Sequence, residues 1–75
     1  MKVVIYGKEY CPFCDKAKMV CEQRGFDYKY YQVGKDFHAD WLLKKFTNAK
    51  TYPQIVIDNT HVGGYTDMME FLDGE

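Results

Sequence analysis

A short run of β-branched and aromatic residues, VVIY at positions 3–6, lies near the start of the chain and ends at Gly7. An apolar run of this length without a polar interruption is typical of a strand that is buried on both faces of a sheet. Over residues 12–24 the apolar positions instead recur at helical spacing, and Gly25 stands where helices commonly end. The pattern therefore predicts a first strand followed by a first helix.

Residues 26–33 favour a second strand, because aromatic and β-branched types are frequent in this segment. Alternation along the segment places Phe26, Tyr28 and Tyr30 on one face. A strand, a helix and a strand within about thirty residues form a βαβ unit with a right-handed crossover. We therefore expect the first two strands to be parallel neighbours.

The second half of the chain repeats neither the length nor the order of these elements. Residues 40–46 (DWLLKKF) have an amphipathic pattern and predict a second helix. Two short apolar runs, 55–57 and 61–62, flank the turn-forming residues 58–60, so they predict a β-hairpin.

A final helix is expected after the hairpin ends at Gly63 and Gly64. Thr66 is the residue type that commonly caps a helix, and the apolar pattern continues through Leu72. Asp67 then falls in the first turn, where a carboxylate interacts favourably with the helix dipole.

In chain order these segments are β-α-β-α-β-β-α, which predicts an α/β fold with a small mixed sheet and helices on both faces. A length of 75 residues leaves room for one domain, which we assign to residues 1–75. Hydrophobic residues make up 47% of the chain, so a disordered chain is excluded.

Charge identifies no partner for the protein. Ten basic and eleven acidic side chains give a formal net charge of -1, without runs of one sign. We therefore expect no nucleic-acid binding. The apolar run at the N-terminus is too short for a signal peptide or a membrane span, so we expect a cytoplasmic protein that does not bind membranes. We also expect a monomer.

The cysteines carry the candidate chemistry. With Cys11 as the N-cap, Pro12 occupies the first helical position, where its missing N–H costs nothing. The Cys11 sulfur can then accept hydrogen bonds from the N–H groups of Phe13 and Cys14, and it faces the positive end of the helix dipole. Both effects favour the thiolate, and Lys8 is the nearest cation in the sequence that could add to them.

The expected change in ionisation is large. A thiol with a pKa of about 8.5 is only about 3% ionised at pH 7, whereas a pKa of about 5 makes it almost fully ionised, a difference of nearly 5 kcal/mol. A helix terminus supplies at most roughly 2 kcal/mol, so hydrogen bonds and a cation must supply the rest.

The spacing of the cysteines assigns their roles. Cys11 and Cys14, three residues apart at a helix start, fall within disulfide distance, so we expect Cys11 to attack a substrate and Cys14 to resolve the product. Cys21 lies about 10.5 Å farther along the helix than Cys14 and is expected to be a small core residue. An odd number of cysteines also argues against a structural disulfide framework.

A zinc site is the main structural alternative for a C-x-x-C pair. Zinc requires two further ligands, but the sequence has no second C-x-x-C. His38 and His61 are isolated, and we interpret each as a solvated loop residue. Redox chemistry is therefore favoured, and no metal is expected.

Three blocks in fixed order resemble the glutaredoxin family over nearly the whole chain. They are residues 11–14 (CPFC) followed by KAK at 16–18, residues 51–55 (TYPQI), and residues 61–67 (HVGGYTD). Phe13 departs from the tyrosine that usually stands between proline and the second cysteine. The resemblance implies a thioredoxin-like fold, with a four-stranded mixed sheet flanked by three helices. It also implies a thiol–disulfide oxidoreductase that uses glutathione to reduce protein disulfides and glutathione mixed disulfides. The sequence does not name the protein substrates, for which a ribonucleotide reductase is one candidate.

The resemblance further implies a glutathione site. Pro53 corresponds to a cis-proline, and the backbone of Tyr52 would bind the cysteinyl part of glutathione. Thr66 and Asp67 would hold the γ-glutamyl end, and Lys8 would lie near the glycyl carboxylate or the thiolate. The remaining residues expected at this site are Phe13, Thr51, Gly64 and Tyr65.

Two other functions remain open at this point. One is a glutaredoxin-like redoxin that thioredoxin reductase reduces, although Thr66 and Asp67 favour glutathione. The other is a non-catalytic metal-binding module that holds an iron–sulfur cluster with glutathione across a dimer. Pro12 and the second cysteine argue against the cluster.

Overall fold

In the computed structural model, which describes residues 1–47 and 49–74, seven elements follow one another in the predicted order. They are β1 (Lys2–Gly7), α1 (Pro12–Arg24), β2 (Asp27–Gln32), α2 (Ala39–Lys45), β3 (Gln54–Ile57), β4 (Thr60–Gly63) and α3 (Tyr65–Asp73). Their boundaries lie within one or two residues of those expected from the hydrophobic pattern.

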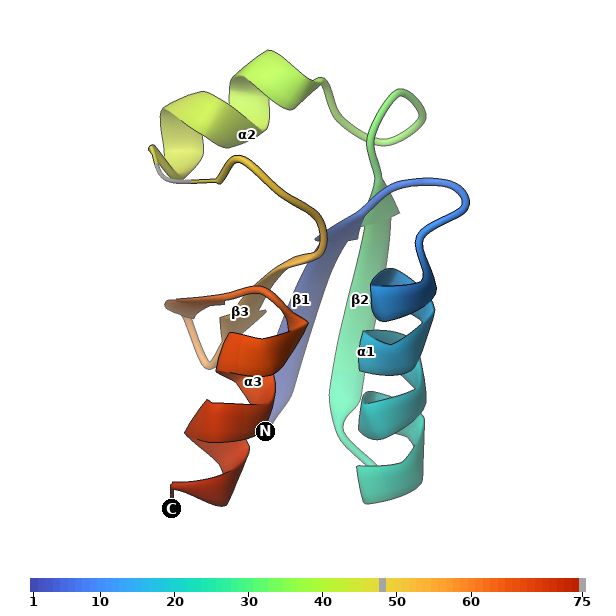
Figure 1. The fold of residues 1–75 in the computed structure, drawn as a ribbon, viewed down its shortest axis with the longest axis vertical. Helices are drawn as coiled ribbons and strands as arrows, with labels where there is room; N and C mark the ends of the chain where they lie inside the picture. The colour runs from blue at the N-terminus through green and yellow to red at the C-terminus, as the bar shows by residue number, and fades with distance from the viewer. Residues whose placement is uncertain (48, 75) are drawn as a thin grey trace.

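The four strands form one mixed sheet in the order β2-β1-β3-β4. β1 and β2 are parallel, with Ile5 opposite Tyr30, which confirms the βαβ unit. β3 is antiparallel to β1, with Ile5 opposite Ile55, and β3 and β4 form the expected hairpin. Figure 1 shows β1 at the centre of the molecule with β2 and β3 beside it. This arrangement is the thioredoxin-like fold.

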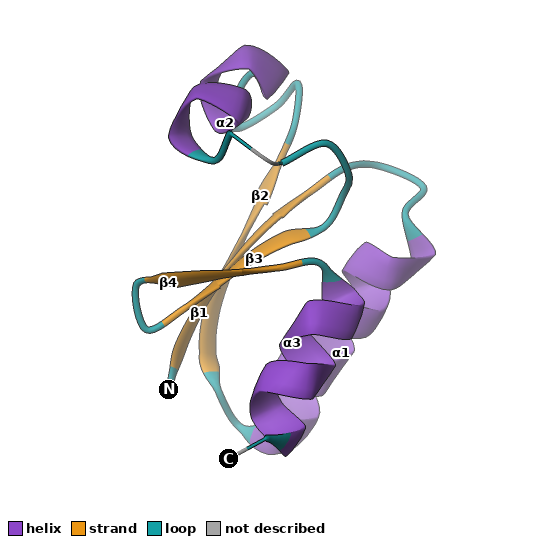
Figure 2. Ribbon diagram, turned by 60° about the vertical axis from the view of Figure 1, so that its left-hand side comes forward, coloured by secondary structure: helices purple, strands orange, loops and turns teal. Residues whose placement is uncertain are grey.

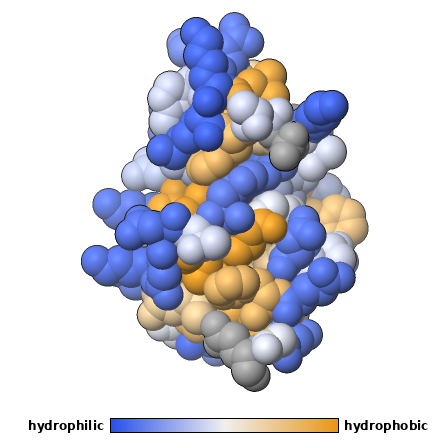
Figure 3. All heavy atoms as spheres, turned by 90° about the vertical axis from the view of Figure 1, so that its left-hand side faces the viewer, coloured by the Kyte–Doolittle hydropathy of each residue, from blue (hydrophilic) through white to orange (hydrophobic). Residues whose placement is uncertain are grey.

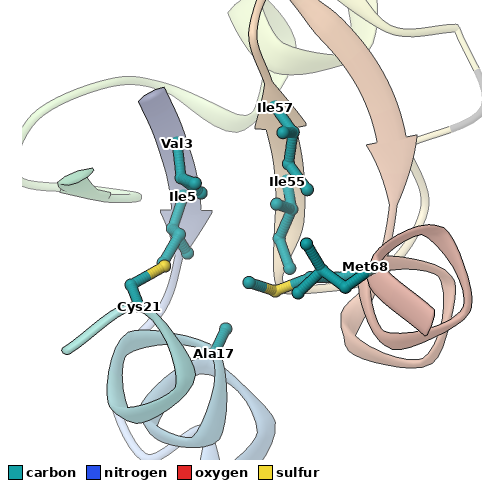
Figure 4. Packing of buried hydrophobic residues seen from close by; sticks show 8 residues of the cluster. Val3, Ile5, Ala17, Cys21, Ile55, Ile57 and Met68 are labelled. Atoms are coloured by element: carbon teal, nitrogen blue, oxygen red, sulfur yellow. The ribbon is translucent and has the colours of Figure 1, made fainter. Parts of the chain in front are cut away.

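Helices α1 and α3 lie side by side on one face of the sheet (Figure 2). The main hydrophobic core fills the space between these helices and the strands. Alternate residues of β1 and β3, including Ile5 and Ile55, meet Ala17 and Cys21 of α1 and Met68 of α3 (Figure 4). Packing against this core places the amino-terminal ends of both helices near the same end of the sheet.

The opposite face carries a smaller, aromatic cluster. Tyr6 is its centre, and its ring stacks on that of Tyr31 at 5.8 Å and meets that of Phe37 edge-on at 5.4 Å. Helix α2 lies beyond the carboxyl ends of β1 and β2 (Figure 1) and contributes Leu42, which is buried in the cluster. The two faces of the sheet are therefore covered to different extents.

The start of α3 differs from the prediction. Gly64, not Thr66, is the N-cap, and Thr66 lies inside the first turn. The preceding Gly63 has φ 115, a conformation that favours glycine and turns the chain into the helix earlier than Thr66 would. The Asp67 carboxylate accepts a hydrogen bond from the Gly64 N–H at 3.0 Å, so the third residue of the helix binds back to the residue that caps it.

Apolar surface is gathered in one region on the side of the molecule that carries the hairpin, and polar side chains surround it (Figure 3). None of the helices in residues 1–47 and 49–74 has the length and apolar character needed to cross a membrane.

Candidate active site

The two sulfurs meet at the amino-terminal end of α1. Cys11 is the N-cap with extended backbone angles, φ -120 and ψ 98, and Pro12 begins the helix as expected. Cys11 and Cys14 form a disulfide, and their Cα atoms are 5.2 Å apart. That separation falls inside the range that a disulfide spans, so the pair can exist as a disulfide or as two thiols.

The helix start provides hydrogen bonding to the Cys11 sulfur. The Cys14 N–H donates to Cys11 Sγ at 3.2 Å. The expected second bond, from the Phe13 N–H, is absent from the described part of the chain. A single N–H bond and the helix dipole both stabilise negative charge on this sulfur, because each places positive partial charge next to it.

Access differs between the three cysteines. Cys11 is 6% exposed, whereas Cys14 and Cys21 are fully buried. Cys21 packs in the main core, where burial raises the pKa of its thiol to about 11, with a further contribution from the Glu22 carboxylate. The prediction that Cys21 is a core residue is confirmed. Cys11 is the sulfur that a substrate can reach.

The loop before β3 lies directly against the dithiol. The Tyr52–Pro53 peptide bond is cis. The carbonyl oxygen of Tyr52 is 4.0 Å from Cys11 Sγ. This loop therefore brings a strip of backbone alongside the reactive sulfur, where an extended peptide can form hydrogen bonds with it.

A cavity of about 510 Å³ begins at this loop and extends to the start of α3. Four segments line it: Phe13 of α1, residues 51–54, residues 61–64 at the end of the hairpin, and residues 65–67 of α3. The Phe13 and Tyr65 rings, with centroids 5.8 Å apart, come from opposite ends of the chain and meet beside it. Its polar wall contains Asp67 and the amino-terminal end of α3, where backbone N–H groups attract anions.

The glutaredoxin family model matches residues 3–62, which is most of the chain and includes both cysteines of the pair. The chain belongs to the glutaredoxin family. It is a thiol–disulfide oxidoreductase, and Cys11 and Cys14 form its dithiol.

Sequence relatives agree with this assignment. Glutaredoxin 1 of Escherichia coli is 37% identical over 96% of this chain and 93% of its own length. Glutaredoxin-C6 of rice is 34% identical over 89% of this chain, which spans only 62% of the length of that protein.

Solved glutaredoxins share the fold. The structure of reduced Escherichia coli glutaredoxin covers all of this chain, which in turn covers 96% of that structure, with a TM-score of 0.83 and 32% identity. A buckwheat glutaredoxin–glutathione complex covers 96% of this chain, which covers 69% of that structure, with a TM-score of 0.67 and 28% identity.

The fold gathers most of the predicted glutathione residues of this glutaredoxin in one place. The cavity is lined by Phe13, Thr51, Tyr52, Pro53, Gly64, Tyr65, Thr66 and Asp67. Lys8 is exposed on the loop between β1 and α1 and does not line the cavity. Any contact between Lys8 and a bound ligand would therefore have to come from the edge of the site.

Four lining residues were not anticipated from the sequence: Gln54, His61, Val62 and Gly63. All four lie inside the motif blocks at 51–55 and 61–67 or directly beside the predicted residues. Their pocket positions follow from the antiparallel pairing of β3 with β4, which sets the two blocks next to each other.

The interpretation of His61 as a solvated loop residue is wrong. His61 is a half-buried residue of β4, its ring stacks on Phe46 at 4.0 Å, and its Nε2 is 2.8 Å from the Gln54 Oε1. Burial lowers the pKa of His61, while the Asp67 carboxylate acts to raise it. His38, by contrast, is exposed just before α2, as expected.

No group of three or more His, Cys, Asp or Glu side chains within residues 1–47 and 49–74 is arranged to hold a metal ion.

Proposed function

We propose that the protein is a dithiol glutaredoxin that uses glutathione to reduce protein disulfides and glutathione mixed disulfides. The observation that carries this proposal is the position of Cys11 next to Tyr52, a residue that lines the cavity. The Tyr52 carbonyl oxygen lies 4.0 Å from Cys11 Sγ, and the cavity runs from Tyr52 as a groove to Asp67 and the start of α3. A glutathione molecule joined to Cys11 through its own sulfur would extend along this groove.

The proposed chemistry needs only the two thiols and glutathione. The Cys11 thiolate attacks one sulfur of a substrate disulfide, a Cys11–substrate disulfide forms, and the second substrate sulfur leaves as a thiolate. With a protein disulfide, Cys14 then attacks Cys11, releases the substrate as a thiol and leaves the Cys11–Cys14 disulfide. Two glutathione molecules reduce that disulfide through a mixed disulfide on Cys11 and leave as glutathione disulfide.

Recognition of glutathione would use both ends of the groove. The backbone of Tyr52 would pair with the cysteinyl residue as a short strand does. N–H groups at the start of α3, near Tyr65 and Thr66, would bind the α-carboxylate of the γ-glutamyl residue. Asp67 would accept a charge-assisted hydrogen bond from its ammonium group, so that both charges of that end are matched. Lys8 would approach the glycyl carboxylate from the edge.

We also propose the setting in which this chemistry takes place. A cytoplasmic location is supported by the free, buried thiol of Cys21, which requires no oxidising compartment. Disulfide-containing proteins such as a ribonucleotide reductase are the proposed substrates, and the protein would act on them as a monomer.

The reductant distinguishes this proposal from a redoxin that thioredoxin reductase reduces. The purified protein is given a small glutathione mixed disulfide, and turnover is followed either with glutathione and glutathione reductase or with thioredoxin reductase. We expect turnover with glutathione and little with thioredoxin reductase. Turnover with thioredoxin reductase and none with glutathione would overturn the proposal.

A further inference from the structure

The buried side-chain amide of Gln54 links the loop before β3 to β4, a strand at the edge of the sheet. Gln54 is 4% exposed, and both ends of its amide are used. Its Nε2 donates to the Thr51 carbonyl oxygen at 2.7 Å and lies 3.5 Å from the Thr51 hydroxyl. Its Oε1 is 2.8 Å from Nε2 of His61. A buried amide with both ends paired holds its partners in place, because breaking either bond leaves a buried polar atom unpaired.

The hydrogen-bond pattern fixes the direction of each bond. A carbonyl oxygen only accepts, so the Gln54 nitrogen must face Thr51 and its oxygen must face His61. His61 Nε2 therefore carries the hydrogen and donates to Gln54 Oε1. On its flat side the imidazole ring is stacked on Phe46 at an interplanar angle of 21°. His61 is thus held both by a hydrogen bond and by a ring contact.

Among the residues that the structure describes, the loop before β3 has few other hydrogen bonds. In the described part of the chain, residues 50–53 take part in no backbone–backbone hydrogen bond outside the helices and strands. Pro53 has no N–H to donate. The Gln54 side chain therefore closes the turn at residues 51–54 from the inside, and His61 of β4 supports the amide from the neighbouring strand.

We propose that Gln54 and His61 are positioning residues of the glutathione groove, which act by fixing the backbone at Thr51 and Tyr52 next to Cys11. This inference rests on the proposed use of glutathione. The two side chains touch the loop rather than the reacting sulfurs, so their effect is on how well the groove fits its ligand. Loss of either bond loosens the backbone strip that a bound glutathione would pair with.

Three substitutions separate the hydrogen bonds from packing. Gln54→Met keeps the length of the side chain and removes both bonds. His61→Phe keeps a ring next to Phe46 and removes the donor, whereas His61→Gln keeps an N–H donor near the position of Nε2 and removes the ring. Gln23→Met, at an exposed position of α1, is the matched control.

The kinetic test measures KM and kcat for a small glutathione mixed disulfide, and separately the reduction of the Cys11–Cys14 disulfide by dithiothreitol. We expect His61→Phe, which loses one hydrogen bond, to raise KM about tenfold with kcat within about twofold. Gln54→Met, which loses both bonds, should raise KM by about tenfold or more, also with kcat within about twofold. His61→Gln should restore KM to within about threefold of the wild-type value. Gln23→Met should match the wild type, and dithiothreitol should reduce all variants equally.

A structural readout that does not depend on glutathione accompanies the kinetics. The amide NMR resonances of Thr51 and Tyr52 should shift in Gln54→Met and His61→Phe and return toward the wild-type positions in His61→Gln. Folded variants with unchanged resonances and unchanged KM would overturn the inference and leave the proposed function intact. Equal slowing with dithiothreitol and glutathione would also overturn it. A wild-type protein that glutathione does not reduce would overturn the proposed function, and the inference with it.

Discussion

At the scale of single residues, the three cysteines have the same side chain and three different environments. Cys11 caps a helix and is reachable, Cys14 donates its backbone N–H to Cys11, and Cys21 lies among apolar side chains on the same helix. Reactivity follows the environment, because the thiolate is the nucleophile and burial without a partner disfavours it. Only the first of the three environments stabilises a thiolate that a substrate can reach.

The raised pKa of Cys21 predicts an alkaline loss of stability. The folded thiol has a pKa of about 11, whereas an unfolded cysteine ionises near about 8.5. The stabilisation is fully present below the unfolded value and is lost as pH rises toward the folded value. After allowance for screening by nearby solvent, about 1–2 kcal/mol should disappear between these pH values.

Urea unfolding of the oxidised protein checks this, because Cys11 and Cys14 are then disulfide-bonded and do not titrate. Cys21→Ala is the comparison, since both proteins share the same titrating tyrosines. The stability advantage of the wild type over Cys21→Ala should shrink as pH is raised from 8 to 11. A difference that does not change with pH would contradict the assigned pKa.

Asp67 is predicted to contribute both to glutathione affinity and to the start of α3. A charge-assisted hydrogen bond is worth about 1.5–3 kcal/mol, so Asp67→Ala should raise KM for a glutathione mixed disulfide by roughly ten- to a hundredfold. Asp67→Ala should also lower stability, because the Gly64 N–H loses its acceptor. Reduction by dithiothreitol, which has no γ-glutamyl group, should barely change.

Asp67→Asn separates the two contributions of this residue. The amide keeps an oxygen that can accept from the Gly64 N–H, but it lacks the charge. Stability should therefore stay close to that of the wild type while KM rises. A folded Asn variant with the wild-type KM would place recognition of the ligand's ammonium group elsewhere.

At the scale of elements, two glycines that lie next to helix ends have positive φ, so substitutions at the two positions can be compared with each other. Gly25 follows α1 with φ 71, and a Cβ there would meet nothing within 4 Å. Gly63 precedes α3 with φ 115, and a Cβ there would press on the Asp67 carboxylate. Both Gly25→Ala and Gly63→Ala should lose about 1–2 kcal/mol of stability through backbone strain.

Only Gly63→Ala should also raise KM for the glutathione mixed disulfide, because it displaces Asp67. Urea unfolding and steady-state kinetics on both variants test this. The same rise in KM in Gly25→Ala would show that strain lowers activity generally. An unchanged KM in Gly63→Ala would show that the position of Asp67 does not matter to binding.

The elements themselves could be predicted because local patterns determine them. Val3 and Ile5 alternate with Val4 and Tyr6, and the two sets pack on opposite faces of the sheet. The cap of α3 could not be predicted, because Thr66 has the side chain that favours the N-cap, whereas the backbone at Gly63 starts the helix earlier. Side-chain preference was overruled by a turn whose geometry appears only in the fold.

At the scale of the whole molecule, the order of the strands in the sheet brings the parts of the site together. Strand β3 pairs with β1 on one side and β4 on the other, so the loop before β3 lies between the dithiol after β1 and the end of the hairpin. The family motifs could identify Cys11, Tyr52 and Asp67 as candidates. They could not place His61, whose burial depends on Gln54 and Phe46 from other parts of the chain.

The division of labour between Cys11 and Cys14 is the central claim, and one measurement tests it most directly. Turnover of a small glutathione mixed disulfide, with glutathione and glutathione reductase, is compared for the wild type, Cys11→Ser and Cys14→Ser. Cys11→Ser should lose all activity, because the attacking sulfur is gone. Cys14→Ser should keep turning over this substrate, since glutathione itself resolves the mixed disulfide on Cys11. Substantial activity in Cys11→Ser, with loss in Cys14→Ser, would contradict the account.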